Sequence, residues 1–542
     1  MINSIRSVAA VAFHSSVRRA DNDNSTMKTI ACINAVSVSP YAELALADGV
    51  SAVDRVKQYT EALPGLERVL VFVAQGAPAE LPETWEAVAR EAWTAQELLG
   101  ELTRVGREYG DEDTLLLHYF IDAPFLDLGI SRRMLENHRR YFAEYTFADG
   151  FPDAVAPTIL NHDMPERLLT LVKPEDDPAD WELLFTVLRR DINAFEVETE
   201  LSNQDYRGLR LHLRCNCRRN YLLCRALYGA GARDEQSLLR LVQERAELLR
   251  TVPAYSSVQV VREVVQPVLY DPFRLVSDPR LGPVEVQHRS NEAGGTDELE
   301  LAPEKFAEYL DMLASFSGDA VVEISHWGEA GRHSRLQELV SAAVARPSIS
   351  LIVRTGGVGW PNGMLERVAE SADESVRLVI ELDANEPELY RTIRGEGFAE
   401  AQRFTERALE LFGSRCHIQA VRTDLNEEPL EDYYRSWKTR TENVIIQKYD
   451  DCAGRLTPRK VVDLSPIKRY PCWHLKRDLV VLLDGSVPVC KQDLDLEHRL
   501  GNVFEDGIES VWAAADRFYR AHLSEDYPSI CRSCDEYYTF NF

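Results

Sequence analysis

The four cysteines near the end of this chain constrain its fold more than any other feature of the sequence. Cys472 precedes, and Cys490 ends, a predicted β-hairpin over residues 479–490, while Cys531 and Cys534 form a Cys-x2-Cys turn. In a reducing compartment, clustered cysteines more often bind metal than form disulfides. We therefore expect the four thiols to converge on one inorganic centre. The ligand type favours an iron–sulfur cluster, with zinc as the alternative and unligated thiols as the remaining option.

Size and charge limit the classes of protein to which the chain can belong. Its 542 residues are enough for about three domains. A net charge of -27 repels phosphate backbones and anionic lipids, and no apolar run reaches the roughly 18 residues that a membrane span needs. We expect a folded, cytoplasmic protein that binds neither nucleic acid nor membranes. Residues 1–26 lack periodicity and are predicted to form a disordered tail.

Residues 27–175 alternate between strand and helix patterns, which predicts a parallel sheet covered by helices. The predicted elements are strands at 29–34, 68–73 and 115–121 and a helix at 52–62. Asp122 follows the last of these strands, at the edge where open α/β sheets bind ligands. The position suits a nucleotide and a divalent cation. The alternative is that the Asp122 side chain only caps the following turn.

Together with His138 and the segment 143–152, this strand end resembles the nucleotidyltransferase type of the GT-A fold over residues 28–170. The resemblance implies that Asp122 and a divalent cation act on a nucleotide or nucleotide sugar. Proteins of that type carry a Gly-rich phosphate loop after the first strand, and the stretch 34–43 contains no glycine. Transferase activity is therefore the alternative hypothesis for the chain.

Residues 176–278 are expected to form a helical connector. Cys215, Cys217 and Cys224 lie within it, but an arginine and a leucine stand four and seven positions after Cys215. These side chains cannot bind iron, so the segment is not a Cys-x3-Cys-x2-Cys cluster loop. We interpret the three thiols as buried or incidental.

Residues 279–450 return to alternating strands and helices. The expected strands are 284–288, 320–325, 349–354 and 376–382, and the expected helices are 303–316 and 336–344. This series resembles the partial (β/α)6 barrel of radical SAM enzymes. The resemblance implies that S-adenosylmethionine or another small-molecule ligand binds at Gly328, Glu329, Thr355 and Asp383, with the Glu329 carboxylate at the methionyl ammonium.

The barrel lacks the three cysteines that hold the radical SAM cluster. They belong in the loop after the first barrel strand, and residues 289–296 contain none. Without thiolates no such cluster forms, and reductive cleavage of S-adenosylmethionine has no electron donor. We expect a barrel that binds a small molecule or serves as a scaffold, without radical chemistry.

Residues 451–542 are similar to the SPASM/twitch extension of radical SAM proteins, in the spacing from Gly485 to Cys490 and in the later Cys-x2-Cys turn. No cysteine follows Cys534, so one auxiliary [4Fe–4S] cluster is expected. The whole α/β arrangement resembles the spiro-SPASM family. This resemblance implies an iron–sulfur protein of radical SAM ancestry, with no known reaction. As our own hypothesis, the C-terminal domain meets a redox or protein partner.

Overall fold

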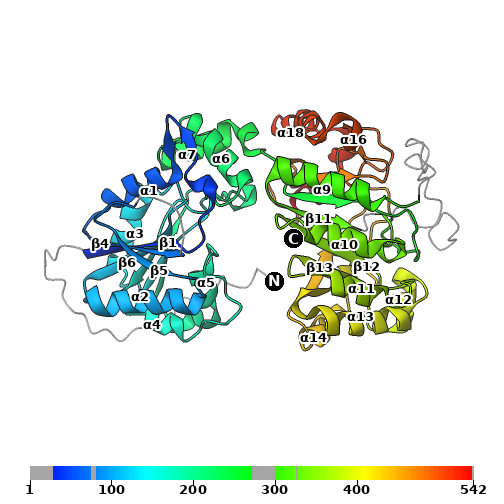
Figure 1. Ribbon diagram of the computed structural model, residues 1–542, viewed down its shortest axis with the longest axis horizontal. Coiled ribbons are helices and arrows are strands. Elements are labelled where there is room, and N and C mark those ends of the chain that lie inside the picture. The colour runs from blue at the N-terminus through cyan, green and yellow to red at the C-terminus, as the bar shows by residue number, and fades with distance from the viewer. Residues whose placement is uncertain (1–27, 75–80, 272–298, 325–326, 540–542) are drawn as a thin grey trace.

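Two sheet-based lobes lie side by side in the structure (Figure 1). The computed structural model describes residues 28–74, 81–271, 299–324 and 327–539. The first lobe is mostly blue and cyan, the second is green and yellow, and the C-terminal segment, in red, lies against one end of the second. The expected mixed α/β fold is confirmed. The tail 1–26, the strand 284–288 and the loop 289–296 lie outside the described residues.

The first lobe is built on a largely parallel sheet. In spatial order its described strands are β5 (Glu86–Arg90), β4 (Leu66–Ala74), β1 (Lys28–Ala35), β6 (Thr114–Phe120), β8 (Thr158–Asn161), β7 (Tyr145–Asp149) and β9 (Val197–Leu201). β1 pairs in parallel with β4 and β6, whereas β8 runs antiparallel to β6 and β7. Ile30 and Cys32 face one core, and Ala31 and Ile33 face the other. Such an apolar strand is typical of a sheet that is covered on both faces.

Helices cover both faces of this sheet. They are α1 (Ala52–Glu61), α2 (Ala95–Tyr109), α3 (Leu128–Arg140), α4 (Met164–Leu169) and α5 (Leu183–Leu188). α1 and α3 pack on one face and α2, α4 and α5 on the other, above and below the strands in Figure 1. Ser51 caps the start of α1: its hydroxyl accepts a hydrogen bond from the Asp54 backbone, and the Asp54 carboxylate accepts one from the Ser51 backbone. This reciprocal cap fixes the start of the helix.

The segment after the first sheet is less helical than predicted. α6 (Arg218–Gly229), α7 (Glu235–Glu244) and the 3-10 helix η4 (Ala246–Leu249) extend the core of the first lobe. However, β9 completes the first sheet, and β10 (Tyr255–Val258) belongs to the second. Both strands are too short for an alternating pattern to be recognised in the sequence. The domain limits at 175, 278 and 450 stay predictions.

All strand pairs of the second sheet are parallel in the described residues. In spatial order the strands are β15 (Val444–Lys448), β14 (Cys416–Arg422), β13 (Val376–Glu381), β12 (Ile349–Thr355), β11 (Ala320–Ile324), β10 and β16 (Asp478–Val481). The helices against its outer face are α9 (Pro303–Ser317), α10 (Leu336–Val344), α11 (Met364–Ser371), α12 (Pro387–Arg394), α13 (Phe398–Phe412) and α14 (Leu430–Lys438). Val322 and Ile324 face these helices, whereas Glu323 lines a cavity on the other side. The inner face therefore carries the polar residues.

The C-terminal segment corrects one prediction. Its elements are α15 (Trp473–Arg477), β17 (Ser486–Val487), β18 (Gly501–Asn502), α16 (Val503–Asp506), α17 (Ile508–Ala514), α18 (Asp516–Leu523), α19 (Ser529–Arg532) and the 3-10 helix η8 (Glu536–Tyr538). The sequence predicts a hairpin over 479–490, but β16 pairs in parallel with β10, and β17 pairs with β18. Leu479 and Val480, which point to opposite faces, are both at most 4% exposed. A strand buried on both faces suits a parallel sheet better than an isolated hairpin.

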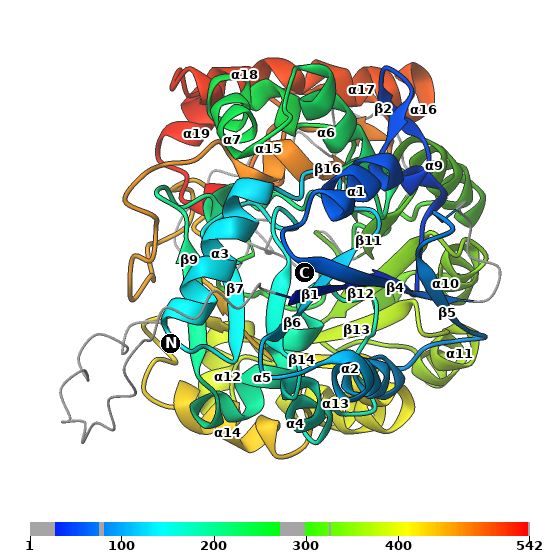
Figure 2. The same cartoon turned by 90° about the vertical axis from the view of Figure 1, so that its left-hand side faces the viewer.

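The C-terminal segment also contacts the first lobe. In Figure 2, α7 and α18 lie at the same end of the molecule, and α18 contacts η4. The Tyr519 hydroxyl of α18 donates to the carbonyl of Ala246 in η4 at 3.2 Å, and Arg210 donates to the carbonyl of Tyr538 at 2.7 Å. The C-terminal segment therefore contacts both lobes, which also meet directly through Arg219 and Asp319.

Candidate metal centre and ligand pocket

The structure brings the four C-terminal cysteines to one cavity. Cys472 directly precedes α15, Cys490 follows β17, Cys531 lies in α19, and Cys534 lies between α19 and η8. All four line the same small cavity, together with His522 of α18. Residues separated by up to about sixty positions thus line one cavity, and their role as metal ligands stays a prediction.

Burial keeps these thiols protonated as long as no metal is bound. It raises the pKa of Cys472 to about 12 and that of Cys531 to about 11. The pKa values of Cys490 and Cys534 are raised further, mainly by burial and then by the neighbouring thiols of the cavity. A metal centre would displace these protons, because the thiolate is the ligand.

Two backbone N–H groups point at the sulfur atoms. The N–H of Gln492 donates to Sγ of Cys490, and the N–H of Glu536 donates to Sγ of Cys534, each at 3.4 Å. Such bonds stabilise thiolate ligands and raise the reduction potential of an iron–sulfur cluster. Four convergent thiols with N–H donors fit a [4Fe–4S] cluster, and their chemistry also suits zinc. In the described residues, no three His, Cys, Asp or Glu side chains approach closely enough for a single ion.

A buried set of ion pairs lies beside the cysteines. Lys491 pairs with Asp450 and with Glu536, each at 2.9 Å, and Lys448 pairs with the other oxygen of Glu536 at 2.5 Å. Lys491 and Gln492 line both the four-cysteine cavity and a second cavity in the barrel. The two sites are therefore separated by one layer of side chains.

The second cavity, which we call the barrel pocket, holds about 230 Å³ at the carboxyl ends of the parallel strands. Gly328, Glu329 and Thr355 line it, as the sequence predicts for a ligand site. Gly328 has no room for a side chain, since a Cβ would lie 2.0 Å from the carbonyl oxygen of Val261. Around Gly328, the pocket wall thus consists of main chain and of the Glu329 and Thr355 side chains.

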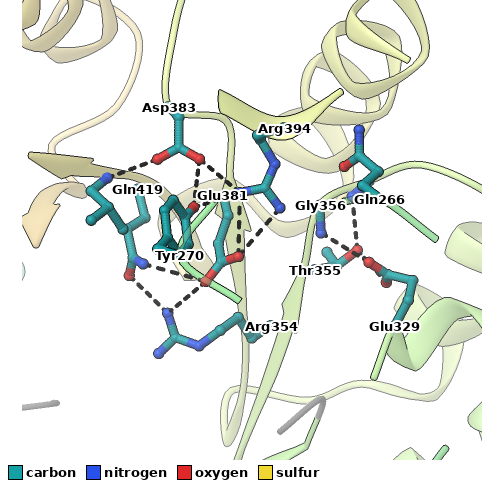
Figure 3. Close-up of polar contacts among 12 residues, drawn as sticks. Gln266, Tyr270, Glu329, Arg354, Thr355, Gly356, Glu381, Asp383, Arg394 and Gln419 are labelled. Carbon is teal, nitrogen blue, oxygen red and sulfur yellow. Dashed lines mark hydrogen bonds and ion pairs between the residues drawn. The ribbon is translucent and has the colours of Figure 1, made fainter. Parts of the chain in front are cut away.

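The Glu329 carboxylate is held by several hydrogen bonds (Figure 3). Its Oε1 accepts from the Thr355 hydroxyl at 2.6 Å and from Nε1 of Trp360 at 3.1 Å, and its Oε2 accepts from the N–H of Gly356 at 3.0 Å. Burial nevertheless raises the pKa of Glu329. The carboxylate is fixed in position and still reaches the pocket, so it can accept from a ligand donor.

Asp383 lies behind the wall of the pocket and does not line it. Its Oδ2 accepts from the Tyr270 hydroxyl at 2.5 Å and from Nη1 of Arg394 at 2.7 Å, and its Oδ1 accepts from the N–H of Val421 at 2.8 Å (Figure 3). Its φ of 64° is rare outside glycine. The expected direct contact between Asp383 and a ligand is thus not what the structure presents, because Arg394 and Tyr270 stand between them.

Sequence reasoning missed a charged layer inside the barrel. Arg354 donates to Glu323 at 2.6 Å and to Gln419 at 2.8 Å, and lies 3.5 Å from Glu381, which also approaches Arg394 (Figure 3). Glu323, Arg354, Glu381 and Gln419 occupy inward positions on β11, β12, β13 and β14, respectively, whereas Arg394 lies in α12. A single charge inside an otherwise apolar strand was the available signal.

In the structure, the Asp122 carboxylate forms a buried ion pair with an arginine. Nε and Nη2 of Arg214 donate to its two carboxylate oxygens at 2.7 and 3.2 Å, and both side chains are at most 4% exposed. Arg214 supplies the positive charge that the sequence assigned to a divalent cation. A cation at Asp122 would have to displace this guanidinium, so the structure offers no support for that site.

The remaining cysteines do not join the four-cysteine cavity. Cys215 and Cys224 are buried, and Cys217 is half-buried before α6. Cys452 lines the barrel pocket.

Comparison with known proteins supports the assignment of the C-terminal segment. The iron–sulfur cluster-binding domain family named SPASM matches residues 472–535, which include all four cysteines. An uncharacterised protein of Treponema pallidum (strain Nichols) is 33% identical over 374 residues, covering 66% of this chain and 98% of that protein. No helix in the described ranges is long and apolar enough to span a membrane.

Solved structures show a more distant similarity. Streptococcus suis SuiB bound to the precursor peptide SuiA is 13% identical with a TM-score of 0.42, covering 66% of this chain and 82% of that one. A cytidylyltransferase from Leptospira borgpetersenii serovar Hardjo-bovis (strain JB197) is 11% identical with a TM-score of 0.33, covering 41% of this chain and 95% of that one.

Proposed function

The chain belongs to the spiro-SPASM family of radical SAM/SPASM-like proteins, and on that premise we propose that it binds one [4Fe–4S] cluster through Cys472, Cys490, Cys531 and Cys534. The cluster supplies a one-electron carrier or a structural centre beside the barrel pocket. The protein holds it, shields it from water and presents a small-molecule ligand one side-chain layer away.

The convergence of the four thiols on one cavity carries this proposal. The two N–H groups directed at sulfur add to it, because they stabilise thiolates. Four thiolate ligands match the preference of iron–sulfur clusters.

Anaerobic purification of the whole chain tests the proposal. We expect a brown protein with about four irons and four sulfides per chain. Cys472→Ser and Cys534→Ser should each lose the colour and most of the iron. Cys217→Ser, which changes a half-buried thiol outside the cavity, should keep both. A colourless protein that contains one zinc per chain, or no metal, would reject the iron–sulfur proposal.

We also propose that the barrel pocket binds a small organic ligand through Glu329. The support is that Glu329 is fixed by Thr355 and Gly356 and reaches a cavity of about 230 Å³. A carboxylate in this position suits an ammonium group, as in S-adenosylmethionine.

A further inference from the structure

A further cavity lies where the first lobe meets the C-terminal segment. It holds about 480 Å³, about twice the volume of the barrel pocket and within the range of organic-ligand sites. Its wall combines residues 204–210, parts of α7 and η4, residues 466–476, α18 and η8. We call it the interlobe cavity. It adjoins the four-cysteine cavity, with which it shares Arg469, His522 and Tyr537.

Positive side chains dominate this wall. Arg210, Lys468, Arg469 and Lys476 line the interlobe cavity. Among the described carboxylates, none forms an ion pair with Lys468, Arg469 or Lys476. Of the two lining acids, Asp205 is paired with Arg207 at 2.8 Å and the other, a glutamate in the turn after α18, is exposed. In a chain with a net charge of -27, this is a local inversion of sign that attracts anions.

Among the positive side chains of this wall, Lys476 illustrates the missing carboxylate partner most clearly. It donates to the carbonyl of Leu209 at 2.9 Å and lies 5.2 Å from the ring centroid of Trp473. Burial, and then the nearby Arg210, lower its pKa to about 7. Lys476 is half-buried. A charge partly withdrawn from water without a counter-ion costs free energy, and an anionic ligand would recover that cost.

Other polar atoms of the wall also lack a partner. Nε of Arg469, Nε2 of His522 and the hydroxyl of Tyr538 are buried and form no hydrogen bond in the described part of the chain. His522 is only 3% exposed. Buried polar groups are normally hydrogen-bonded. The Tyr538 hydroxyl is therefore open to a ligand of the interlobe cavity, whereas Arg469 and His522 can also serve the adjoining four-cysteine cavity.

Aromatic rings form the rest of the wall. The lining rings are those of Tyr206, Tyr470, Trp473, Tyr519, Tyr537 and Tyr538. Gly208 lets the first-lobe loop approach closely, because a Cβ at this position would lie 2.7 Å from the ring of Tyr470. Flat rings beside cations favour a ligand that joins a planar ring to a negative charge.

We propose that the interlobe cavity binds a nucleotide, with its phosphates at Lys476, Arg469 and Lys468 and its base against the aromatic rings. Inorganic phosphate would leave most of the 480 Å³ empty and the rings uncovered. None of the residues proposed to hold the nucleotide is a proposed cluster ligand, so this site goes beyond the function proposed above.

Isothermal titration calorimetry with ADP, on the anaerobically purified whole chain, tests this site. We expect ADP to bind, and adenosine and pyrophosphate each to bind at least about tenfold more weakly. Lys476→Met should weaken ADP binding by about tenfold or more, because one charge-assisted contact is lost. Lys57→Met, which changes a lysine of α1, is the matched control and should leave the affinity unchanged.

Lys468→Met gives the same measurement if Lys476→Met does not fold, and iron content and circular dichroism show whether each variant is intact. No heat from ADP at millimolar concentration overturns the proposal. It is also overturned if ADP binds to Lys476→Met and to Lys468→Met as tightly as to the wild type. Binding of adenosine or pyrophosphate as tight as that of ADP overturns it as well.

Discussion

Single residues in this protein are placed by partners that lie far away in the sequence. Arg214 pairs with Asp122, which is 92 positions away in the sequence. Arg354 donates to Glu323 and to Gln419, which lie on two other strands. Removing one member of such a buried pair leaves an uncompensated charge, which costs more than the pair contributes. The identity of these residues is visible in the sequence, but their pairing is not, because it has no fixed spacing.

His118 leads to a prediction on pH. It lies in β6 at 4% exposure, 3.4 Å from the Asn34 amide, and burial with the nearby Arg214 lowers its pKa to about 3. In the unfolded chain its pKa is about 6.5. The unfolded state therefore binds the extra proton first, and the contribution of His118 to stability is present above pH 6.5 and is lost as the pH falls towards 3.

We expect the first lobe to lose up to about 1.4 kcal/mol per pH unit from His118 between pH 6 and 5. Urea unfolding of the wild type and of His118→Gln at both pH values measures this. The variant should show a smaller loss over the interval. Equal losses in the two proteins would mean that His118 does not stay neutral in the folded state.

Elements with strong local signals could be predicted from the sequence. The helix over 336–344 agrees with α10, and the helix over 303–316 agrees with α9, where Pro303 occupies the first turn. β16 could not be assigned to its partner, because pairing between Tyr255 and Asp478 leaves no local pattern. The four cysteines were identifiable because their chemistry and spacing are local features. The charged layer inside the barrel could not be predicted, because it depends on the register of four strands.

The pairing of β16 predicts that a change in the C-terminal segment destabilises the barrel. Leu479 is 2% exposed and belongs to the core of the second lobe. Leu479→Ala should lower the free energy of unfolding of that lobe by about 2–5 kcal/mol. Leu464→Ala, at a position that is 67% exposed, should change it by less than about 0.5 kcal/mol.

Hydrogen exchange distinguishes the pairing of β16 with β10 from the isolated hairpin that the sequence predicts. In Leu479→Ala the amides of β10 and β11 should exchange faster, because β16 is hydrogen-bonded to β10. Faster exchange confined to residues 472–539 would support the isolated hairpin instead.

At the scale of the whole molecule, the C-terminal segment links both lobes. Arg250 at the end of the first lobe donates to the carbonyls of Leu475 and Trp512, and Trp512 donates to the carbonyl of Thr251, all at 2.8–2.9 Å. The proposed cluster would tie the start of α15, the helix that carries Leu475, to the turn around Cys531 and Cys534. The cytoplasmic location and a redox or protein partner at this end stay predictions.

Removal of the metal centre should therefore loosen this segment first. When iron is chelated under anaerobic conditions, we expect amides in residues 468–492 and 529–538 to exchange at least about tenfold faster, while β1 and β6 do not change. Hydrogen exchange with mass spectrometry measures this. Chelator treatment of Cys472→Ser is the control and should have no effect. Unchanged exchange in the wild type would mean that the fold of the segment does not depend on its metal.

The parallel register from Tyr255 to Asp478 also bears on how this family can be recombined. A chain shortened to end after β15 would leave one side of β10 bare, with backbone donors and acceptors open to a second molecule. The barrel and the cysteine segment thus share the hydrogen-bonded strand pair β10–β16. Chimaeras that exchange these parts between family members have to preserve that pairing, residue for residue, or they will associate through the exposed strand.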